Sequence, residues 1–177
     1  PRQRLQCSLY DTEFALELSR SLIMAKMHNQ RVVLKRYEAS KDQDCDAEKK
    51  IIAVSCEKAK DAEDGQSLLG YEGTAARAYF QGMGKCVDEA FYFEKRSRRP
   101  PLDPFNSMLS FGYSMLLREI QVSLETHGLN SYFGFFHRDA EKSPSLACDL
   151  IEEWRAVIVD ATVMSAVNKH IIRREHF

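Results

Sequence analysis

The chain has 177 residues, of which 44% are hydrophobic and 29% are charged, which suits one globular domain with a real core. No apolar run approaches the roughly 18 residues needed to span a bilayer, which excludes a membrane-spanning helix in this sequence. The formal net charge of −1 excludes a uniformly basic nucleic-acid binder but is compatible with a local basic patch.

The five cysteines are odd in number, scattered, and nowhere spaced as CxxC, so we interpret them as reduced thiols rather than a disulfide framework or a zinc site. With no secretory signal pattern, we expect a cytoplasmic protein that does not contact a membrane. The chain opens on Pro1 within a helix-like pattern and stops on RREHF, so we expect residues 1–177 to be one domain, a fragment of a longer polypeptide.

Most segments carry apolar residues at steps of three or four, so we expect a mainly α fold. A first long helix is expected within residues 11–30, with Asp11 as its N-cap. A second is expected from Asp46 to about Ala62. The apolar positions expected to face the core are Phe14, Leu18, Leu22 and Ala25 in the first helix, and Ile51, Ile52, Ala59 and Ala62 in the second.

A third helix is expected at residues 68–80, which read LLGYEGTAARAYF, and it carries a carboxylate in its apolar stripe. Glu72 falls near the centre of that stripe, and an ionised carboxylate taken out of water needs a partner, a proton or a metal ion. Two interpretations of Glu72 stay open. It pairs with a buried Arg or with backbone N–H groups, or it acts as a metal ligand or general base. The stripe comprises Leu68, Leu69, Ala75, Ala76, Tyr79, Phe80 and Met83, with Thr74, Arg77 and Gln81 opposite.

Residues 84–103 mix aromatics, a basic run and two prolines, which predicts a loop with a short hairpin-like excursion. Within it, Glu94–Pro101 reads EKRSRRPP, which suits either a solvated loop or contacts with phosphates. A second basic cluster lies near the end of the first long helix, so positive charge is expected to gather at two places. This cluster comprises Lys26, His28, Arg31, Lys35 and Arg36.

Asp103 followed by Pro104 predicts the start of a helix, because an N-cap acid precedes a proline at the first helical position. This helix should continue to a stop at Gly128. Two further helices are expected, one at residues 143–157 and one at about residues 160–168.

Asp149 and Glu152 are three residues apart and project from one side of the helix at residues 143–157. The spacing alone favours a solvated polar face, and the alternative is a carboxylate pair for a hard divalent cation. His137 ends an aromatic run and becomes a site candidate only if it converges with these acids and Glu72. The residues expected on the opposite, apolar side of the helix are Leu146, Ala147, Leu150, Ile151 and Trp154.

Several motifs, in order, resemble the CRISPR-associated spacer-acquisition integrase family. They are GYEGTAARAYF, RSRRPPLDPFNSMLSFGYSMLL, GFFHRD and SPSLACDLIEEWR, and the opening QCSLYDTEFALELSRSLIMAKMHNQRVVL is similar to the start of that family's helical domain. The resemblance covers nearly the whole chain. It implies the multi-helix catalytic domain, without the family's N-terminal β-rich domain. The implied activity is metal-dependent DNA integration and endonuclease chemistry, in which a 3′-hydroxyl attacks a phosphodiester at the repeat boundary of a CRISPR array.

The resemblance also implies roles for single residues. Glu72, His137 and Glu152 match the family's ligands for one divalent metal ion. One histidine and two carboxylates suit Mn²⁺ or Mg²⁺ better than a thiolate-loving ion. Asp149 matches an acidic position that supports the site, and Asn106 in the LDPFN motif matches a position to which we assign structural support. The residues expected to contact nucleic acid are Arg96, Arg98, Arg99 and, near the metal ligands, Arg155.

The implied partners are double-stranded DNA, as spacer precursor and as CRISPR repeat, and the small CRISPR-associated dimeric protein of the acquisition complex. The family implies a homodimer in the full-length protein and a prokaryotic cytoplasm. Some members are fused to a reverse transcriptase, and these residues leave such a fusion or association open. Two alternatives are a mobile-element integrase of the same superfamily and a non-catalytic helical subunit that organises DNA. The joint presence of Glu72, His137 and Glu152 speaks against the second alternative.

Overall fold

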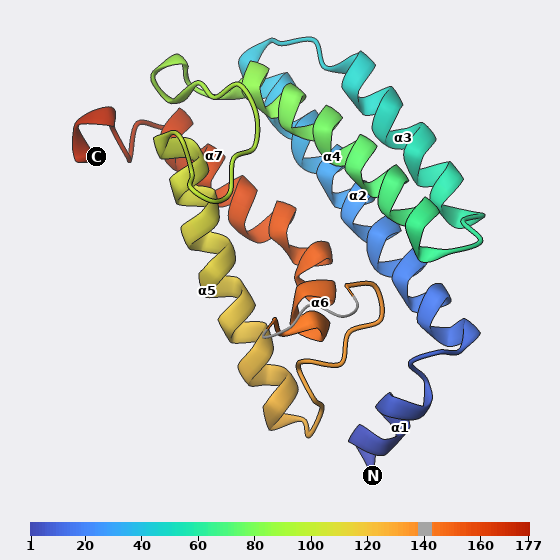
Figure 1. Cartoon of the computed structure of the whole chain (residues 1–177). Coiled ribbons are helices and arrows are strands. Elements are labelled where there is room, and N and C mark those ends of the chain that lie inside the picture. Colours follow the sequence, from blue (N-terminus) through green and yellow to red (C-terminus); the bar gives the residue numbers. More distant parts are fainter. Residues whose placement is uncertain (138–142) are drawn as a thin grey trace.

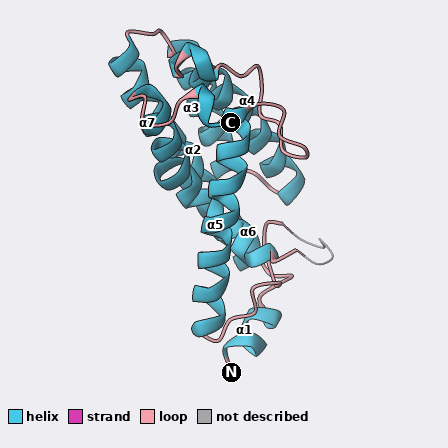
Figure 2. Cartoon of the chain, turned by 90° about the vertical axis from the view of Figure 1, so that its left-hand side faces the viewer, coloured by secondary structure: helices cyan, strands magenta, loops and turns pink. Residues whose placement is uncertain are grey.

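The computed structural model describes residues 1–137 and 143–177, and in this part of the chain all regular structure is helical, with no strand (Figures 1 and 2). The mainly α prediction is confirmed. Within the same residues, no helix is both long enough and apolar enough to cross a membrane.

The helices follow the expected order along the chain. Three short segments separate or extend them: the 3₁₀ turns η1 (Glu89–Phe91) and η3 (Arg174–His176), and the π-helical turn η2 (Ala156–Asp160). The α-helices are α1 (Arg2–Ser8), α2 (Glu13–Lys41), α3 (Asp46–Lys60), α4 (Gly65–Cys86), α5 (Pro104–Thr126), α6 (Ser145–Arg155) and α7 (Ala161–Asn168).

Side-chain caps explain where two of the helices begin. The carboxylate of Asp103 accepts a hydrogen bond from the backbone N–H of Asn106 at 2.7 Å, with Pro104 at the first position of α5, as predicted. Asp64 caps α4 in the same way. Gly128, with a φ of +75°, follows the end of α5 and supplies the left-handed conformation that a helix stop favours.

Several boundaries differ from the prediction. The N-cap of α2 is Thr12 rather than Asp11, and α2 continues past residue 30 to Lys41, because its last turns still bury Leu34 and Tyr37 in the core. Residues 84–86 belong to α4, and the connection that follows contains η1 where a hairpin-like excursion was expected.

Helices α2, α3 and α4 lie side by side, and α6 packs between α2 and α5 (Figure 1). The core lies where these helices meet. Its largest fully buried residues include Ile23, Met27, Leu34, Ile52, Leu68, Tyr79, Met83, Phe105, Leu109 and Met164.

Three residues expected in the core are exposed: Phe14, Ile51 and Leu69, the last of these by 52%. The buried face of α2 includes Ser19, Lys26 and Gln30 as well as apolar residues. Because these polar residues are buried, a pattern based on apolar residues alone predicted the wrong buried face for α2. All five cysteines are free thiols, as predicted.

Candidate metal centre

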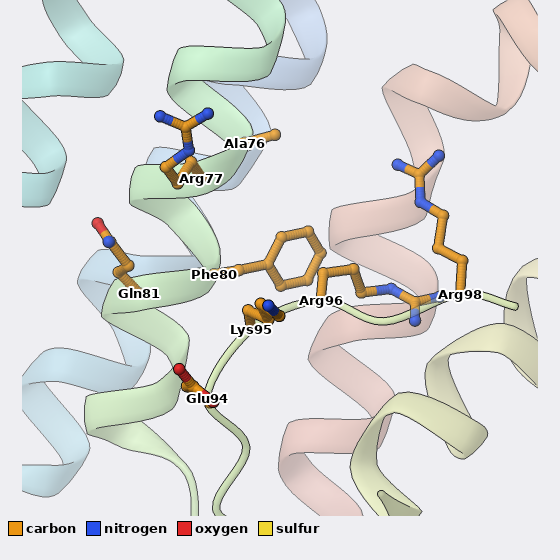
Figure 3. Close-up of a pocket in the computed structure, with 8 residues that line it drawn as sticks. All are labelled: Ala76, Arg77, Phe80, Gln81, Glu94, Lys95, Arg96 and Arg98. Carbon is orange, nitrogen blue, oxygen red and sulfur yellow. The ribbon is translucent and has the colours of Figure 1, made fainter. Parts of the chain in front are cut away.

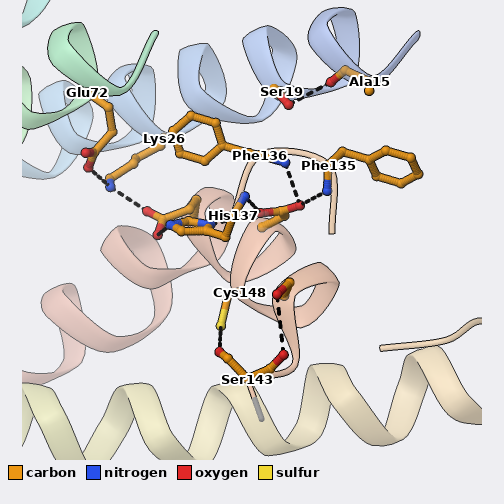
Figure 4. A network of polar contacts seen from close by, with 12 residues as sticks. Ala15, Ser19, Lys26, Glu72, Phe135, Phe136, His137, Ser143 and Cys148 are labelled. Atoms are coloured by element: carbon orange, nitrogen blue, oxygen red, sulfur yellow. Dashed lines mark hydrogen bonds and ion pairs between the residues drawn. The ribbon is translucent and has the colours of Figure 1, made fainter. Parts of the chain in front are cut away.

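Side chains from α2, α4 and α6 meet at one buried point. The ammonium group of Lys26 on α2 contacts both Glu72 Oε1 on α4 and Glu152 Oε2 on α6 (Figure 4). The Lys26 side chain is only 3% exposed, and both carboxylates are largely buried. Glu72 therefore does face inward, and its partner in this structure is a lysine from a helix 46 positions away in sequence rather than an arginine.

Glu152 sits at the centre of this cluster. Its Oε1 pairs with Arg155 Nη2 at 3.0 Å, while its Oε2 faces Lys26. Burial by itself would raise the pKa of Glu152, but the positive charges of Lys26 and Arg155 outweigh that effect and lower the pKa to about 2. The group is therefore a carboxylate throughout the neutral range.

His137 reaches the cluster from the loop that precedes α6. Its Nδ1 lies 2.8 Å from Asp149 Oδ1, and its Nε2 lies 4.0 Å from Glu152 Oε1. A carboxylate facing Nδ1 favours the tautomer with the proton on Nδ1, so that Nε2 presents its lone pair toward Glu152. A histidine held in this way by a carboxylate is the usual arrangement of a metal-ligating imidazole.

Asp149 is fully buried and organises the loop that carries His137. It accepts hydrogen bonds from the backbone N–H groups of Phe135, Phe136 and His137 at 2.6, 3.0 and 2.8 Å (Figure 4). The prediction of a solvated polar face on α6 is wrong, because Glu152 is buried too. Trp154, expected on the apolar side, is instead 46% exposed.

A second group of side chains adjoins the cluster through Arg155 and is centred on Tyr113 of α5 and Asp160 of the π-helical turn. The guanidinium groups of Arg155 and Arg96 both lie against the ring of Tyr113, at 4.8 and 5.4 Å from its centre. The Tyr113 hydroxyl donates to buried Asp160 at 2.5 Å, and the Tyr79 hydroxyl donates to the same carboxylate at 3.0 Å. Burial raises the pKa of Asp160 to about 6, although these hydrogen bonds act in the opposite direction.

A groove with positively charged walls runs between α4 and the loop that precedes α5 (Figure 3). Its volume is about 590 Å³. Ala76 and Phe80, which follow Glu72 at steps of four on one face of α4, form part of its floor, so the groove begins one helical turn from Glu72. We call it the cationic groove, and its lining residues are Ala76, Arg77, Phe80, Gln81, Glu94, Lys95, Arg96 and Arg98.

The arginines expected to contact nucleic acid have different surroundings. Arg98 and Arg99 are exposed. Arg96 is held by Asn106 Oδ1 and Ser110 Oγ, each at 2.9 Å, so its guanidinium is partly committed to the fold. Arg155 is 16% exposed and paired with Glu152. Phosphate contacts by these four side chains stay a prediction.

Asn106 is buried and ties the loop to the start of α5. It accepts from the backbone N–H of Ser97 at 3.1 Å and donates to the carbonyl oxygen of Lys95 at 2.9 Å. This position suits the structural role that we assign to it.

Lys26 departs from the expected second basic cluster. His28, Arg31, Lys35 and Arg36 are exposed, but Lys26 is buried between two carboxylates, so its place in a surface cluster is wrong. The role of Lys26 could have been predicted from its position on the buried face of α2. A lysine on a buried face needs a charged partner, as Glu72 does.

A separate acidic group lies at the turn between α2 and α3, away from these residues. Carboxylate oxygens of Glu38, Asp44 and Asp46 lie within 4.8 Å of one another. Lys49 already pairs with two of them, Glu38 at 2.5 Å and Asp46 at 2.8 Å, and the group is partly exposed. None of the three belongs to the site residues predicted from the sequence.

The donors around Lys26 fit a hard divalent cation. Glu72 and Glu152 offer carboxylate oxygens from two helices, and His137 offers an imidazole nitrogen. Glu152 Oε2 is buried and accepts no aligned hydrogen bond, although Lys26 is close enough for an ion pair. The ammonium group of Lys26 lies between the two carboxylates, in the position that a metal ion bound by both would take.

Comparison with known proteins gives a consistent result. The family model described as CRISPR associated protein Cas1 matches residues 2–177. A CRISPR-associated endonuclease Cas1 of Mycobacterium tuberculosis is 38% identical over 180 residues, covering 100% of this chain and 52% of that protein. A second, from Chlorobaculum tepidum, is 39% identical over 168 residues, covering 90% of this chain and 49% of that protein. The chain thus spans about half the length of these curated relatives.

Solved structures agree with the sequence relatives. A chain of a Cas6-RT-Cas1–Cas2 complex superposes with a TM-score of 0.90 at 30% identity, covering 98% of this chain and 19% of that one. A casposase bound to integration product superposes with a TM-score of 0.88 at 28% identity, covering 98% of this chain and 49% of that one.

Proposed function

Because the chain belongs to the CRISPR associated protein Cas1 family, we propose that it is the catalytic domain of a divalent-metal-dependent DNA integrase and endonuclease that inserts new spacers into a CRISPR array. The observation that carries this proposal is a connected cluster, in which Lys26 bridges Glu72 and Glu152, and His137 Nε2 lies 4.0 Å from Glu152 Oε1. Glu72, His137 and Glu152 come from different segments of the chain, and a helical scaffold has no need to bring them together.

In this proposal, Glu72, Glu152 and Nε2 of His137 hold Mg²⁺ or Mn²⁺. When bound, the ion would stabilise charge on the phosphoryl oxygens and help to activate the attacking 3′-hydroxyl. Asp149 orients the His137 ring through Nδ1, and Arg155 holds Glu152 in place. Because one phosphodiester replaces another, little net bond energy changes, and positioning and electrostatics account for most of the rate.

The cationic groove would position the DNA. Its lysine and arginines suit contacts with backbone phosphates, which hold a duplex in register without reading its bases. The groove starts one turn of α4 from Glu72, so a backbone lying in it would run toward the proposed metal ligands. Arg98 and Arg99 are the exposed arginines of the EKRSRRPP loop and are placed for such contacts.

We propose as partners double-stranded DNA and a small Cas2-type protein. The similarity to a Cas6-RT-Cas1–Cas2 complex and to a casposase bound to integration product supports this choice. Homodimerisation of the full protein, a fused or associated reverse transcriptase and a cytoplasmic location stay predictions. The relatives with 38–39% identity are CRISPR-associated endonucleases, which favours a CRISPR array over a mobile element as the setting.

An integration assay tests the proposal. The intact protein, with its small partner, is incubated with a labelled DNA fragment and a supercoiled plasmid that carries a CRISPR repeat. We expect label to enter the plasmid only with Mg²⁺ or Mn²⁺, and to be lost in Glu72→Gln. The matched control is Glu63→Gln, which makes the same change at an exposed position just before α4. Integration by Glu72→Gln at the wild-type rate, or in the presence of a chelator, would contradict the proposal.

A further inference from the structure

We propose that Lys26 is a resident cation of the metal site, which a divalent ion must displace from between Glu72 and Glu152, so that the ion binds tightly only when a DNA phosphate is also present. This inference rests on the proposed function and deepens it, because it adds a residue and a condition for loading the site.

The position of Lys26 is the first observation. Its ammonium contacts one oxygen of each carboxylate, and those carboxylates stand on helices that are distant in sequence (Figure 4). An ion that used both Glu72 and Glu152 as ligands would need the same space. The ammonium of Lys26 is carried on a flexible four-carbon stem, so it can leave the carboxylates without a change in α2.

The burial of Lys26 is the second observation. The side chain is 3% exposed and belongs to the buried line of α2 that also contains Ile23 and Gln30. Burying a lysine is costly unless its charge is matched, and here it is matched twice. The same pairing would let the two carboxylates face each other when no metal ion is bound.

The local charge balance is the third observation. The described residues of the cluster include three carboxylates, those of Glu72, Asp149 and Glu152, and two cations, Lys26 and Arg155, which pair with Glu72 and Glu152. The charge of Asp149 is already committed to backbone N–H groups and to His137. The charges of Glu72 and Glu152 are therefore nearly neutralised by Lys26 and Arg155. A divalent ion that entered beside Lys26 would be repelled by its positive charge, and this repulsion is strong in a poorly solvated site.

A DNA phosphate would remove that obstacle. Mg²⁺ sites in nucleic-acid enzymes commonly use one or two carboxylates and complete their ligands with phosphate oxygens of the substrate. The cationic groove begins one helical turn from Glu72, so DNA bound there would bring negative charge to the cluster. The phosphate would attract the ion and also give the displaced ammonium of Lys26 a new partner. Metal loading and DNA binding are then coupled, and the coupling must be reciprocal.

Direct measurement of Mn²⁺ binding tests this inference without relying on activity. Free Mn²⁺ is followed by its electron paramagnetic resonance signal during titration of the intact protein, with and without a DNA duplex. We expect wild-type affinity for Mn²⁺ to rise at least about tenfold with DNA. Lys26→Met should bind Mn²⁺ at least about tenfold more tightly than wild type without DNA, and should show little further gain with DNA.

The control and a second readout complete the test. Lys50→Met removes a positive charge from an exposed position on α3 and should behave like wild type. Because Lys26→Met leaves two carboxylates facing each other, its thermal midpoint should fall without metal and rise more steeply with Mn²⁺ than that of wild type. Lys26→Gln, which keeps hydrogen-bond donors, should show the same changes if Lys26→Met does not fold.

The outcomes separate this inference from the proposed function. If wild type binds Mn²⁺ equally well with and without DNA, and neither Lys26 variant binds it more tightly, the role of Lys26 is refuted while the metal site stands. If wild type binds no Mn²⁺ even with DNA, the metal site itself is refuted.

Discussion

Replacing Asp149 by Asn tests how the proposed metal centre is held together. The two carboxylate oxygens of Asp149 accept from the backbone N–H groups of Phe135, Phe136 and His137, and one of them also faces His137 Nδ1. An asparagine keeps one acceptor oxygen and turns an NH₂ group toward the donors on the other side. The donors that lose their acceptor are the N–H groups of Phe135 and Phe136, or the N–H group of His137, depending on how the amide is turned.

The structure indicates the size of the effect. A buried donor left without an acceptor costs about 1–3 kcal/mol, so the loss of one or two acceptors should lower the free energy of unfolding by about 1–6 kcal/mol. A domain is typically stable by only about 5–15 kcal/mol, so this is a large fraction of the total. Because His137 loses its orientation as well, we expect integration to fall by about 10–100-fold, the usual cost of a lost supporting residue at a metal site.

Urea unfolding followed by circular dichroism measures the first quantity, and integration across a range of Mn²⁺ concentrations measures the second. The control is Asp61→Asn, which makes the same change at an exposed position and should leave both unchanged. Excess Mn²⁺ should partly restore integration by Asp149→Asn where the variant is folded. An unchanged urea midpoint together with complete, Mn²⁺-independent loss of integration would refute the reasoning and make Asp149 a metal ligand.

With DNA present, Glu72→Gln should abolish integration and Mn²⁺ binding, and it should lower the urea midpoint because buried Lys26 loses one of its two carboxylate partners; tight Mn²⁺ binding by this variant would count against the ligand assignment. Changing Arg98 and Arg99 together to Ala should weaken binding to unrelated DNA sequences equally and reduce the slope of log affinity against log salt by about one per lost contact, whereas an unchanged slope would mean that the loop is only solvated. Arg96→Ala should in addition lower the urea midpoint, because its guanidinium is hydrogen-bonded within the fold. The pKa of Asp160 is raised from 3.8 to about 6, so its stabilising contribution is complete below pH 3.8 and is lost as the pH rises through 6. Wild type should therefore lose about 3 kcal/mol relative to Asp160→Asn between pH 4 and 7, at about 1.4 kcal/mol per pKa unit, and a pH-independent difference in urea unfolding would contradict this.

The helical fold could be predicted because its determinants are local. Asp103 and Pro104 open α5, Gly128 follows its end, and apolar residues repeat at helical spacing in each segment. Such signals depend on neighbours within one or two turns, and they hold whatever the tertiary structure is. The exposed side of α4 was predicted correctly for the same reason. Helix ends that depend on packing were not, and α2 extends to Lys41 because later turns find a core.

Part of the candidate site could also be predicted. Glu72 was a site candidate from the sequence alone, because a carboxylate on an apolar helix face needs a partner. His137 and Glu152 had no such local signal and came from the resemblance of whole motifs to a known family. In the structure Lys26 joins Glu72 to Glu152, and His137 lies beside Glu152, although the role of each as a ligand stays a prediction.

Only the tertiary structure decided which polar faces are buried. Helical periodicity distinguishes an apolar face from a polar one, but a polar face can meet solvent or the polar face of another helix. On α6 it meets the loop with His137, and on α2 it meets Glu72 and Glu152 through Lys26. The matching of buried charges is a property of side chains that are distant in sequence, so no pattern within a single helix could have placed Lys26 in the site.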